Sequence, residues 1–220
     1  MGFKAIIFDL DGVIVSTDEH HYRAWKKVAD EEAIYFDEII NMRLRGVSRM
    51  ESLEIVLEKS QKQYSKEEKL LLAERKNLYY KNLIKNLTPD DILPGVIDLL
   101  SLLKENGIKI AIGSSSKNSP EILSYIGLDS YFDATVDGND INNSKPHPEV
   151  FLKAAYALGQ SPQDCLVVED AASGVVAALA AGMKVVGVSS AATDKNADYT
   201  AESLEGFNTD LIIRESAISK

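Results

Sequence analysis

The chain has 220 residues, of which 45% are hydrophobic, a composition that suits one folded core with a smaller attached domain. Its 34 acidic and 24 basic side chains give a formal net charge of -10, which would repel nucleic acids and anionic membrane surfaces, so we expect neither as a partner. The single cysteine, Cys165, cannot form an internal disulfide, and because we find no secretory leader or membrane-length apolar run, we expect a soluble, cytoplasmic protein. We also expect it to be a monomer.

Short apolar runs that end in polar residues recur along the chain and predict strands of a parallel sheet. The first covers residues 3–8 and is followed by Asp9-Leu10-Asp11-Gly12. Three later runs share the pattern and lie at residues 108–112, 165–168 and 184–188. Such a run is typical of a buried strand that presents polar groups at its carboxyl end.

Helical patterns separate the later runs, and each ends at a glycine, a residue that commonly follows the last turn of a helix. They lie at residues 96–105, 120–126, 148–158 and 175–181. Alternation of strands and helices predicts an α/β fold, namely a Rossmann-like parallel sheet core with helices on both faces.

Residues 16–91 break this alternation because they carry helical periodicity but no strand pattern. We interpret them as an inserted all-helical cap domain, with residues 1–15 and 92–220 forming the core domain. Ser16-Thr17-Asp18-Glu19 has the spacing of a capping box, and the following apolar stripe consists of Tyr22, Trp25, Val28 and Ala29. Since the insertion starts soon after the first strand, it could form a mobile lid over the groups which that strand presents.

Two acidic pairs follow predicted strands, at the edge where open α/β sheets bind ligands. Asp9 and Asp11 follow the first strand, although their motif alone equally suits a turn. Glu169 and Asp170 follow another strand, and four carboxyl groups gathered there would repel one another without a cation. Mg²⁺ suits this cluster because it prefers oxygen ligands and commonly joins carboxylates to a substrate phosphate. The alternative is that Glu169 and Asp170 only cap the next helix.

Two further segments carry groups suited to phosphate. The strand at 108–112 leads into the polar run 113–118, whose hydroxyls, backbone amides and following helix could form a phosphate cradle, although serine-rich loops are also ordinary turns. Lys145 precedes another predicted helix. Beside Asp9 its ammonium would neutralise a transferring phosphoryl group, whereas a solvated surface lysine is the plainer alternative.

In chain order, Asp-x-Asp-Gly, Ser114, Lys145 and Glu169-Asp170 resemble the four signature segments of the haloacid dehalogenase-like phosphotransferase superfamily, and the insertion resembles its helical cap. The resemblance implies that Asp9 is a nucleophile that becomes an aspartyl phosphate, and that Asp11 is the general acid and base. Ser114 and Lys145 would bind phosphate. The implied Mg²⁺ site consists of Asp9, Asp11 through its backbone carbonyl, Glu169 and Asp170.

Residues 44–49, 75–77 and 114–118 resemble the β-phosphoglucomutase branch of that superfamily. The resemblance implies a second phosphate site made of Arg49, Ser116, Lys117 and Asn118. The residues implied to contact the sugar or form the cap hinge are Thr17, His21, Trp25, Gly46, Val47, Ser48, Lys76 and Ser115. For Trp25, helical spacing favours a place in the cap core instead, and a solvated helix face is the alternative for the arginines of this basic segment.

This resemblance implies an isomerase that interconverts β-glucose 1-phosphate and glucose 6-phosphate through a bisphosphorylated sugar, so the expected ligand is a small phosphorylated sugar. Two alternatives stay open. One is a magnesium-dependent sugar-phosphate phosphatase with the same aspartyl intermediate and water as the acceptor. The other is a catalytically silent phosphate-binding regulator. Ala171 and Ser115 depart from the common pattern of the branch, which bears on sugar preference more than on phosphotransfer.

Overall fold

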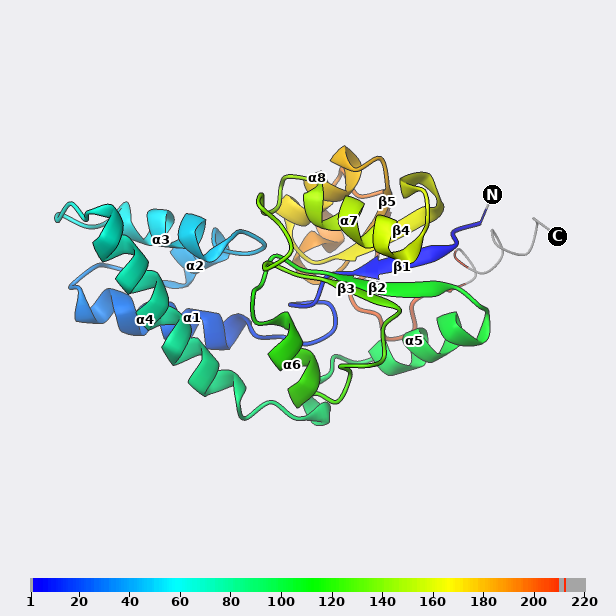
Figure 1. Ribbon diagram of the computed structural model, residues 1–220, viewed down its shortest axis with the longest axis horizontal. Helices are drawn as coiled ribbons and strands as arrows, with labels where there is room; N and C mark the ends of the chain where they lie inside the picture. The colour runs from blue at the N-terminus through cyan, green and yellow to red at the C-terminus, as the bar shows by residue number, and fades with distance from the viewer. Residues whose placement is uncertain (1, 210–211, 213–220) are drawn as a thin grey trace.

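The computed structural model describes residues 2–209 and residue 212, which form a sheet-containing core and a separate group of helices (Figure 1). The core is built on a six-stranded sheet with the order β3-β2-β1-β4-β5-β6, in which each pair of neighbours is parallel. The strands are β1 (Ala5–Phe8), β2 (Lys109–Gly113), β3 (Ala134–Val136), β4 (Cys165–Glu169), β5 (Lys184–Gly187) and β6 (Tyr199–Thr200). Because β1 pairs with both β2 and β4, the carboxyl ends of these three strands lie together.

Helices cover both faces of the sheet, so the α/β prediction is confirmed (Figure 1). One face packs against α5 (Val96–Glu105) and α6 (Ser119–Tyr125), and the other against α7 (Glu149–Leu158) and α8 (Ala172–Ala180). Alternate residues of β1 point to opposite faces: Phe8 joins the first cluster and Ile7 the second. Burial on both faces is the reason that the strands read as continuous apolar runs.

The inserted segment forms four α-helices and, throughout residues 16–91, no strand. They are α1 (Asp18–Glu31), α2 (Glu38–Met42), α3 (Arg49–Leu57) and α4 (Lys66–Ile84). Capping boxes begin α3, with Ser48 and Glu51, and α4, with Ser65 and Glu68. The helices enclose a separate apolar cluster that includes Trp25, Val28, Ala29, Leu53 and Leu72. The predicted helical cap and the predicted stripe of its first helix are therefore present.

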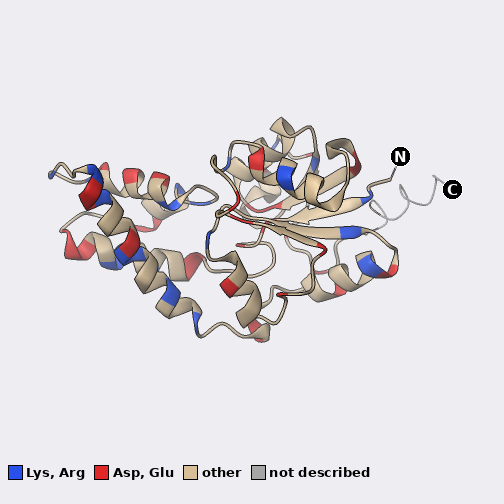
Figure 2. Cartoon of the chain, viewed as in Figure 1, with Lys and Arg blue, Asp and Glu red and all other residues tan. Residues whose placement is uncertain are grey.

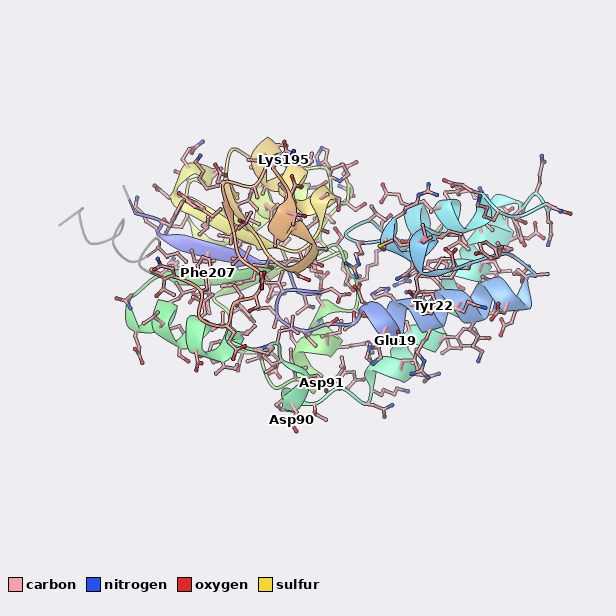
Figure 3. All side chains as sticks on the ribbon, turned by 180° about the vertical axis from the view of Figure 1, so that it is seen from behind. Glu19, Tyr22, Asp90, Asp91, Lys195 and Phe207 are labelled. Atoms are coloured by element: carbon pink, nitrogen blue, oxygen red, sulfur yellow. The ribbon has the colours of Figure 1, made fainter. Side chains whose placement is uncertain are left out.

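The two chain segments that connect cap and core run side by side. Val15 pairs with Ile92 in an isolated antiparallel bridge, and the Leu93 N–H donates to the Ile14 carbonyl at 2.9 Å. The return passes through the short 3₁₀ helix η1 (Pro89–Asp91), which carries the labelled Asp90 and Asp91 of Figure 3. The division at residues 15/16 and 91/92 stays a prediction, and residues 210, 211 and 213–220 of the predicted core lie outside the described part of the chain.

Three details differ from the sequence-based expectation. Helix α1 begins after Thr17 rather than Ser16, and the Thr17 side chain caps no helical N–H because its hydroxyl is directed to the Asp11 carboxylate. Helix α8 begins at Ala172 rather than Val175, since Gly174 lies inside the helix instead of ending the loop. The short strands β3 and β6, and the 3₁₀ helices η2 (Pro162–Asp164) and η3 (Ser189–Thr193), carry too few residues to form a recognisable pattern.

Acidic and basic residues are interspersed along the helices of both domains (Figure 2). The excess of acidic groups nevertheless lies almost entirely in the core: residues 16–91 carry 15 acidic and 14 basic side chains, whereas residues 1–15 and 92–220 carry 19 acidic and 10 basic ones. Within the described residues, every helix is too short or too polar to cross a membrane.

Candidate active site

Three carboxylates meet at the carboxyl ends of β1 and β4. Asp9, Glu169 and Asp170 are all buried, and each offers an oxygen within 4.8 Å of the others. The backbone fixes this proximity, because the Asp9 N–H donates to the Val168 carbonyl of β4 at 2.9 Å. Burial, followed by the charges of Glu169 and Asp9, raises the pKa of Asp170 to about 9. A buried, mutually repelling set of oxygen ligands fits a divalent cation such as Mg²⁺.

Lys145 neutralises part of this cluster. Its fully buried ammonium donates to Asp9 Oδ1 and to Glu169 Oε1, at 2.6 Å in each case. Burial opposes the charged ammonium, but the attraction of the two carboxylates outweighs it and raises the pKa of Lys145 above its ordinary value. A buried pair of this kind holds its groups in fixed positions. The structure thus places Lys145 beside Asp9, whereas the alternative of a solvated lysine is wrong.

Helix α8 approaches the cluster so closely that it requires a glycine. A Cβ added at Gly174 would lie 1.8 Å from Glu169 Oε1. Glu169 also accepts the Ala171 N–H at the start of α8, at 2.8 Å. Glu169 therefore does accept a backbone N–H at the start of α8, as the capping alternative expects. The same side chain also accepts a hydrogen bond from Lys145, which that alternative does not explain.

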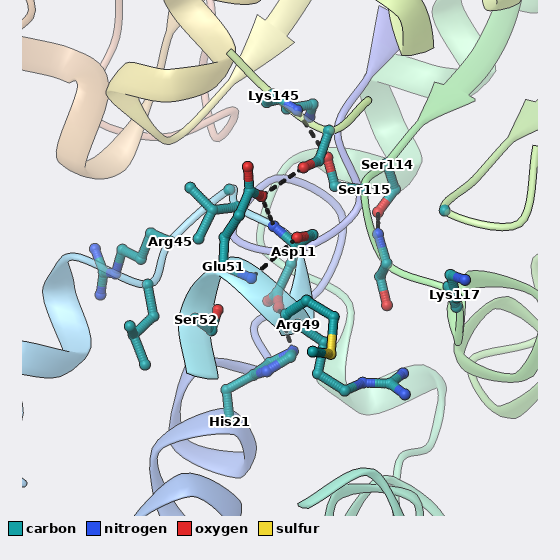
Figure 4. A pocket seen from close by; sticks show the side chains of 18 of the residues that line it. Asp11, His21, Arg45, Arg49, Glu51, Ser52, Ser114, Ser115, Lys117 and Lys145 are labelled. Atoms are coloured by element: carbon teal, nitrogen blue, oxygen red, sulfur yellow. Dashed lines mark hydrogen bonds and ion pairs between the residues drawn. The ribbon is translucent and has the colours of Figure 1, made fainter. Parts of the chain in front are cut away.

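Asp11 points away from the three clustered carboxylates, toward the cap. Its Oδ1 accepts the Thr17 N–H at 2.7 Å, and its Oδ2 accepts the Thr17 hydroxyl at 2.5 Å. His21 Nε2 lies 3.4 Å from the same Oδ2 (Figure 4). Enclosure between cap and core raises the pKa of Asp11 to about 7, although the Thr17 hydroxyl opposes the shift. The two aspartates of one turn thus occupy different environments.

The polar loop after β2 has a compact, self-bonded shape. The Ser116 N–H donates to Ser114 Oγ at 3.1 Å, and the Asn118 N–H donates to Ser116 Oγ at 3.2 Å. A neighbouring turn supports the loop, since a Cβ at Gly138 would lie 2.4 Å from the Ser115 carbonyl. Loop residues Ser114, Ser115 and Lys117 face the cavity described below (Figure 4).

The cap contributes two basic side chains, Arg49 and Lys76, to the opposite side. Arg43 and Arg45 are paired with Glu58 and Asp18, whereas no carboxylate within the described chain pairs with Arg49. Burial lowers the pKa of Arg49. Lys76 is almost wholly buried, its Nζ lies 2.8 Å from His21 Nδ1, and burial and then Arg49 hold its pKa well below the ordinary value.

The loop from Arg45 to Ser48 docks directly on the core. The Ser173 hydroxyl donates to the Arg45 carbonyl at 3.3 Å, and Arg45 Nη1 donates to Ser190 Oγ at 3.1 Å. Gly46 has φ +73°, and a Cβ there would lie 2.2 Å from Ser173 Oγ. Glycine therefore serves both the turn and the close approach of the two domains.

Cap and core together enclose a cavity of about 1100 Å³. Arg49, Glu51 and Ser52 of α3 lie across it from Ser114 and Lys117 of the core (Figure 4). Every predicted site residue lines it except two, which stand behind the lining: Thr17 and Glu169. The predicted residues that do line it are Asp9, Asp11, His21, Trp25, Gly46, Val47, Ser48, Arg49, Lys76, Ser114, Ser115, Ser116, Lys117, Asn118, Lys145 and Asp170. Trp25 also belongs to the cap core, so both of its interpretations describe it.

Several residues of the site were missed from the sequence. Glu51 accepts the Ser144 hydroxyl at 2.6 Å and so links cap to core; its capping-box spacing from Ser48 was a usable signal. Asn77 accepts the side-chain amide of Asn118 at 3.0 Å. Tyr80 is fully buried beside Thr17, and nothing in its local pattern distinguishes it from a core tyrosine.

A family model for haloacid dehalogenase-like hydrolases matches residues 3–182. The chain belongs to this family, and the resemblance of its signature segments to the superfamily is confirmed.

Within this family, the chain is similar to β-phosphoglucomutases and to a sugar-phosphate phosphatase. The chain is 44% identical over 214 residues to the β-phosphoglucomutase of Bacillus subtilis, covering 96% of this chain and 95% of the relative. A crystal structure of β-phosphoglucomutase from Clostridium difficile superposes with a TM-score of 0.92 at 42% identity, covering 99% of this chain and all of the other. The phosphorylated carbohydrates phosphatase of Thermotoga maritima is 33% identical over 185 residues, covering 82% of each chain.

Proposed function

We propose that this chain is an isomerase, a phosphomutase that interconverts β-glucose 1-phosphate and glucose 6-phosphate through an aspartyl phosphate and β-glucose 1,6-bisphosphate. The observation that carries the proposal is a single cavity with a set of residues suited to phosphate at each of its two ends. Asp9 and Lys145 mark the core end, and Arg49, which pairs with no described carboxylate, marks the cap end. The likeness to the β-phosphoglucomutases of B. subtilis and C. difficile supports the same reaction.

Asp9 is the proposed nucleophile. One of its oxygens attacks phosphorus, and the bond from phosphorus to the sugar oxygen breaks as the aspartyl phosphate forms. Lys145, locked against Asp9 and Glu169, offsets the negative charge that gathers there. Bound at Asp9, Asp170, Glu169 and the Asp11 carbonyl, Mg²⁺ would supply the further positive charge that lets a carboxylate approach an anionic phosphate.

Asp11 is the proposed general acid and base. It gives a proton to the sugar oxygen that leaves phosphorus, and in the second transfer it takes a proton from the attacking hydroxyl of the reoriented sugar. A pKa of about 7 makes both protonation states accessible near neutral pH. Its separation from the three clustered carboxylates supports this division of work, because its side chain faces the sugar side of the cavity.

The cap end of the cavity would hold the phosphate that is not being transferred. Arg49 offers a planar guanidinium, which grips phosphate through two hydrogen bonds. Ser116, Lys117 and Asn118 would complete this site from the core, while Ser114 stays with the transferring phosphate. The sugar between them would contact residues of the cap and hinge, namely His21, Gly46, Val47, Ser48 and Lys76, with Thr17 at the hinge and Ser115 in the loop.

A second candidate is a sugar-phosphate phosphatase, which the 33% identity to the T. maritima phosphatase favours. It would use Asp9 in the same way but pass the phosphoryl group to water. Direct bonds between the domains support the mutase, because Ser144 with Glu51 and Asn118 with Asn77 hold the cap against the core and restrict water.

The test is a product assay with β-glucose 1-phosphate, Mg²⁺ and a trace of β-glucose 1,6-bisphosphate. Formation of glucose 6-phosphate supports the mutase, and omission of the bisphosphate should slow its appearance. Free glucose with inorganic phosphate would support the phosphatase instead. Binding of the sugar phosphate without either product would leave a silent regulator as the function.

A further inference from the structure

Tyr80 is a buried side chain of the cap helix α4 that reaches the groups around Asp11. Its hydroxyl lies 2.9 Å from Thr17 Oγ1, and the ring is fully enclosed. It does not line the cavity, so it acts on the site through its neighbours.

The hydrogen-bond chain through Thr17 has a defined direction. Thr17 has one hydroxyl proton and gives it to Asp11 Oδ2 at 2.5 Å when that carboxylate is ionised. Its oxygen must then accept the Tyr80 hydroxyl proton. When Asp11 carries a proton, both hydroxyls can rotate and the chain runs the other way, from Asp11 through Thr17 to Tyr80. The same two side chains therefore serve either state of the carboxyl group.

Tyr80 also supports the second partner of the Asp11 carboxylate. Its ring centroid lies 4.1 Å from that of His21, whose Nε2 is 3.4 Å from Asp11 Oδ2. Lys76 Nζ sits 4.5 Å from the Tyr80 ring centroid and contacts the other ring nitrogen of His21. One residue thus fixes the orientations of Thr17 and His21 at once.

We propose that Tyr80 is a positioning residue for the proton-transfer step. Through Thr17 and His21 it orients the Asp11 carboxyl group, so this orientation depends on the placement of α4. The proposal rests on the proposed function of the site. Because α4 belongs to the cap and Asp11 to the core, proton transfer is aligned only while the two domains keep this arrangement.

The variant Tyr80→Phe removes one oxygen and keeps the ring. The matched control is Tyr79→Phe, which removes the adjacent hydroxyl of the same helix, bonded to Glu31 at the surface at 2.8 Å. We would measure kcat and KM for the mutase reaction, and Asp9 labelling by acetyl phosphate. Acetate is a weak base that leaves without a proton, so this donor does not need Asp11 as an acid.

We expect Tyr80→Phe to lower kcat for the sugar phosphate by about two- to tenfold, the effect of one hydrogen bond, with KM unchanged. Labelling by acetyl phosphate should stay at the wild-type rate, which also shows that the variant is folded. Tyr79→Phe should match wild type in every measurement. In a Thr17→Val background Tyr80→Phe should add little, because the path through Thr17 is already cut.

An equal loss with both donors, a loss confined to KM, or full additivity with Thr17→Val would overturn the positioning role. Absence of glucose 6-phosphate with the wild-type protein would instead overturn the proposed function. The wild-type product and the variant's dependence on the donor thus separate the two failures.

Discussion

The two ends of the cavity differ in whether their basic side chains are paired with carboxylates. At the core end Lys145 is paired with Asp9 and Glu169 in a rigid, buried arrangement at the ends of β1 and β4. At the cap end Arg49 is unpaired among the described residues, and Lys76 is held by a histidine rather than a carboxylate. The core end is thus preorganised by paired charges, whereas the cap end leaves Arg49 without a carboxylate partner in the described chain, as the proposed binding of an anionic ligand there requires. Four experiments would break or sharpen this contrast.

The largest effect is expected at the core end, from Asp9→Asn. The amide keeps the size of the side chain but removes the anionic nucleophile, so labelling by a phosphoryl donor should be abolished. Phosphate incorporation is measured by mass spectrometry, and circular dichroism controls for the fold. Stable labelling of the folded variant would rule out Asp9 as the nucleophile.

Asp11→Asn and Asp170→Asn separate the two kinds of carboxylate. Asp11→Asn should lower turnover by about two to four orders of magnitude through lost proton transfer, while Mg²⁺ affinity is largely kept because its carboxylate lies apart from the clustered ligands. Asp170→Asn should weaken Mg²⁺ binding, measured by calorimetry. Equal loss of Mg²⁺ affinity in both variants, with proton transfer intact, would contradict the division of roles.

Arg49→Lys tests the cap end. It keeps the charge and loses the planar fork, so Asp9 phosphorylation by the sugar bisphosphate should fall by about ten- to a hundredfold. Phosphorylation by acetyl phosphate, which has no second phosphate, should change less. Arg43→Lys is the matched control, since Arg43 pairs with Glu58 on the cap surface. If both donors lose rate equally, the distal phosphate site has to be abandoned.

The smallest effect is expected from the loss of a hydrogen bond between the cap and the core. Ser144→Ala removes the hydroxyl that bonds Glu51, which should weaken cap closure and raise hydrolysis relative to transfer by about two- to tenfold. The ratio of inorganic phosphate to glucose 6-phosphate measures this. Ser60→Ala, at a turn within the cap, is the control. An unchanged ratio would show that this bond does not restrict water.

The sequence predicted the core end of the site better than the cap end, for a physical reason. Parallel strands bring their carboxyl ends to one edge, so the strand-end positions of Asp9 and Glu169 were enough to predict their proximity. The contact of Lys145 with Asp9 spans 136 residues. The local pattern offered it only beside the alternative of a solvated lysine, and the family resemblance favoured it. Short elements such as β3 and β6 left no periodicity to recognise.

Cap residues depend on how one domain docks on another, which local pattern does not encode. Arg49 and Lys76 were named from resemblance alone, and Tyr80 was missed because a buried tyrosine on a helix reads as core. Thr17 shows the limit of local rules: its spacing suggested part of a helix cap, but its hydroxyl is directed to the Asp11 carboxylate instead.

The paired linkers of Val15 and Ile92 have a consequence for how such proteins diversify. Since the chain leaves and re-enters the core through adjacent, hydrogen-bonded residues, the cap is a cassette inserted into a single loop of an otherwise continuous fold. Exchange of that cassette would change the distal binding groups while leaving the acidic cluster and Lys145 untouched. It would also exchange Tyr80, so the residue that orients the Asp11 carboxyl group would be replaced together with the cap.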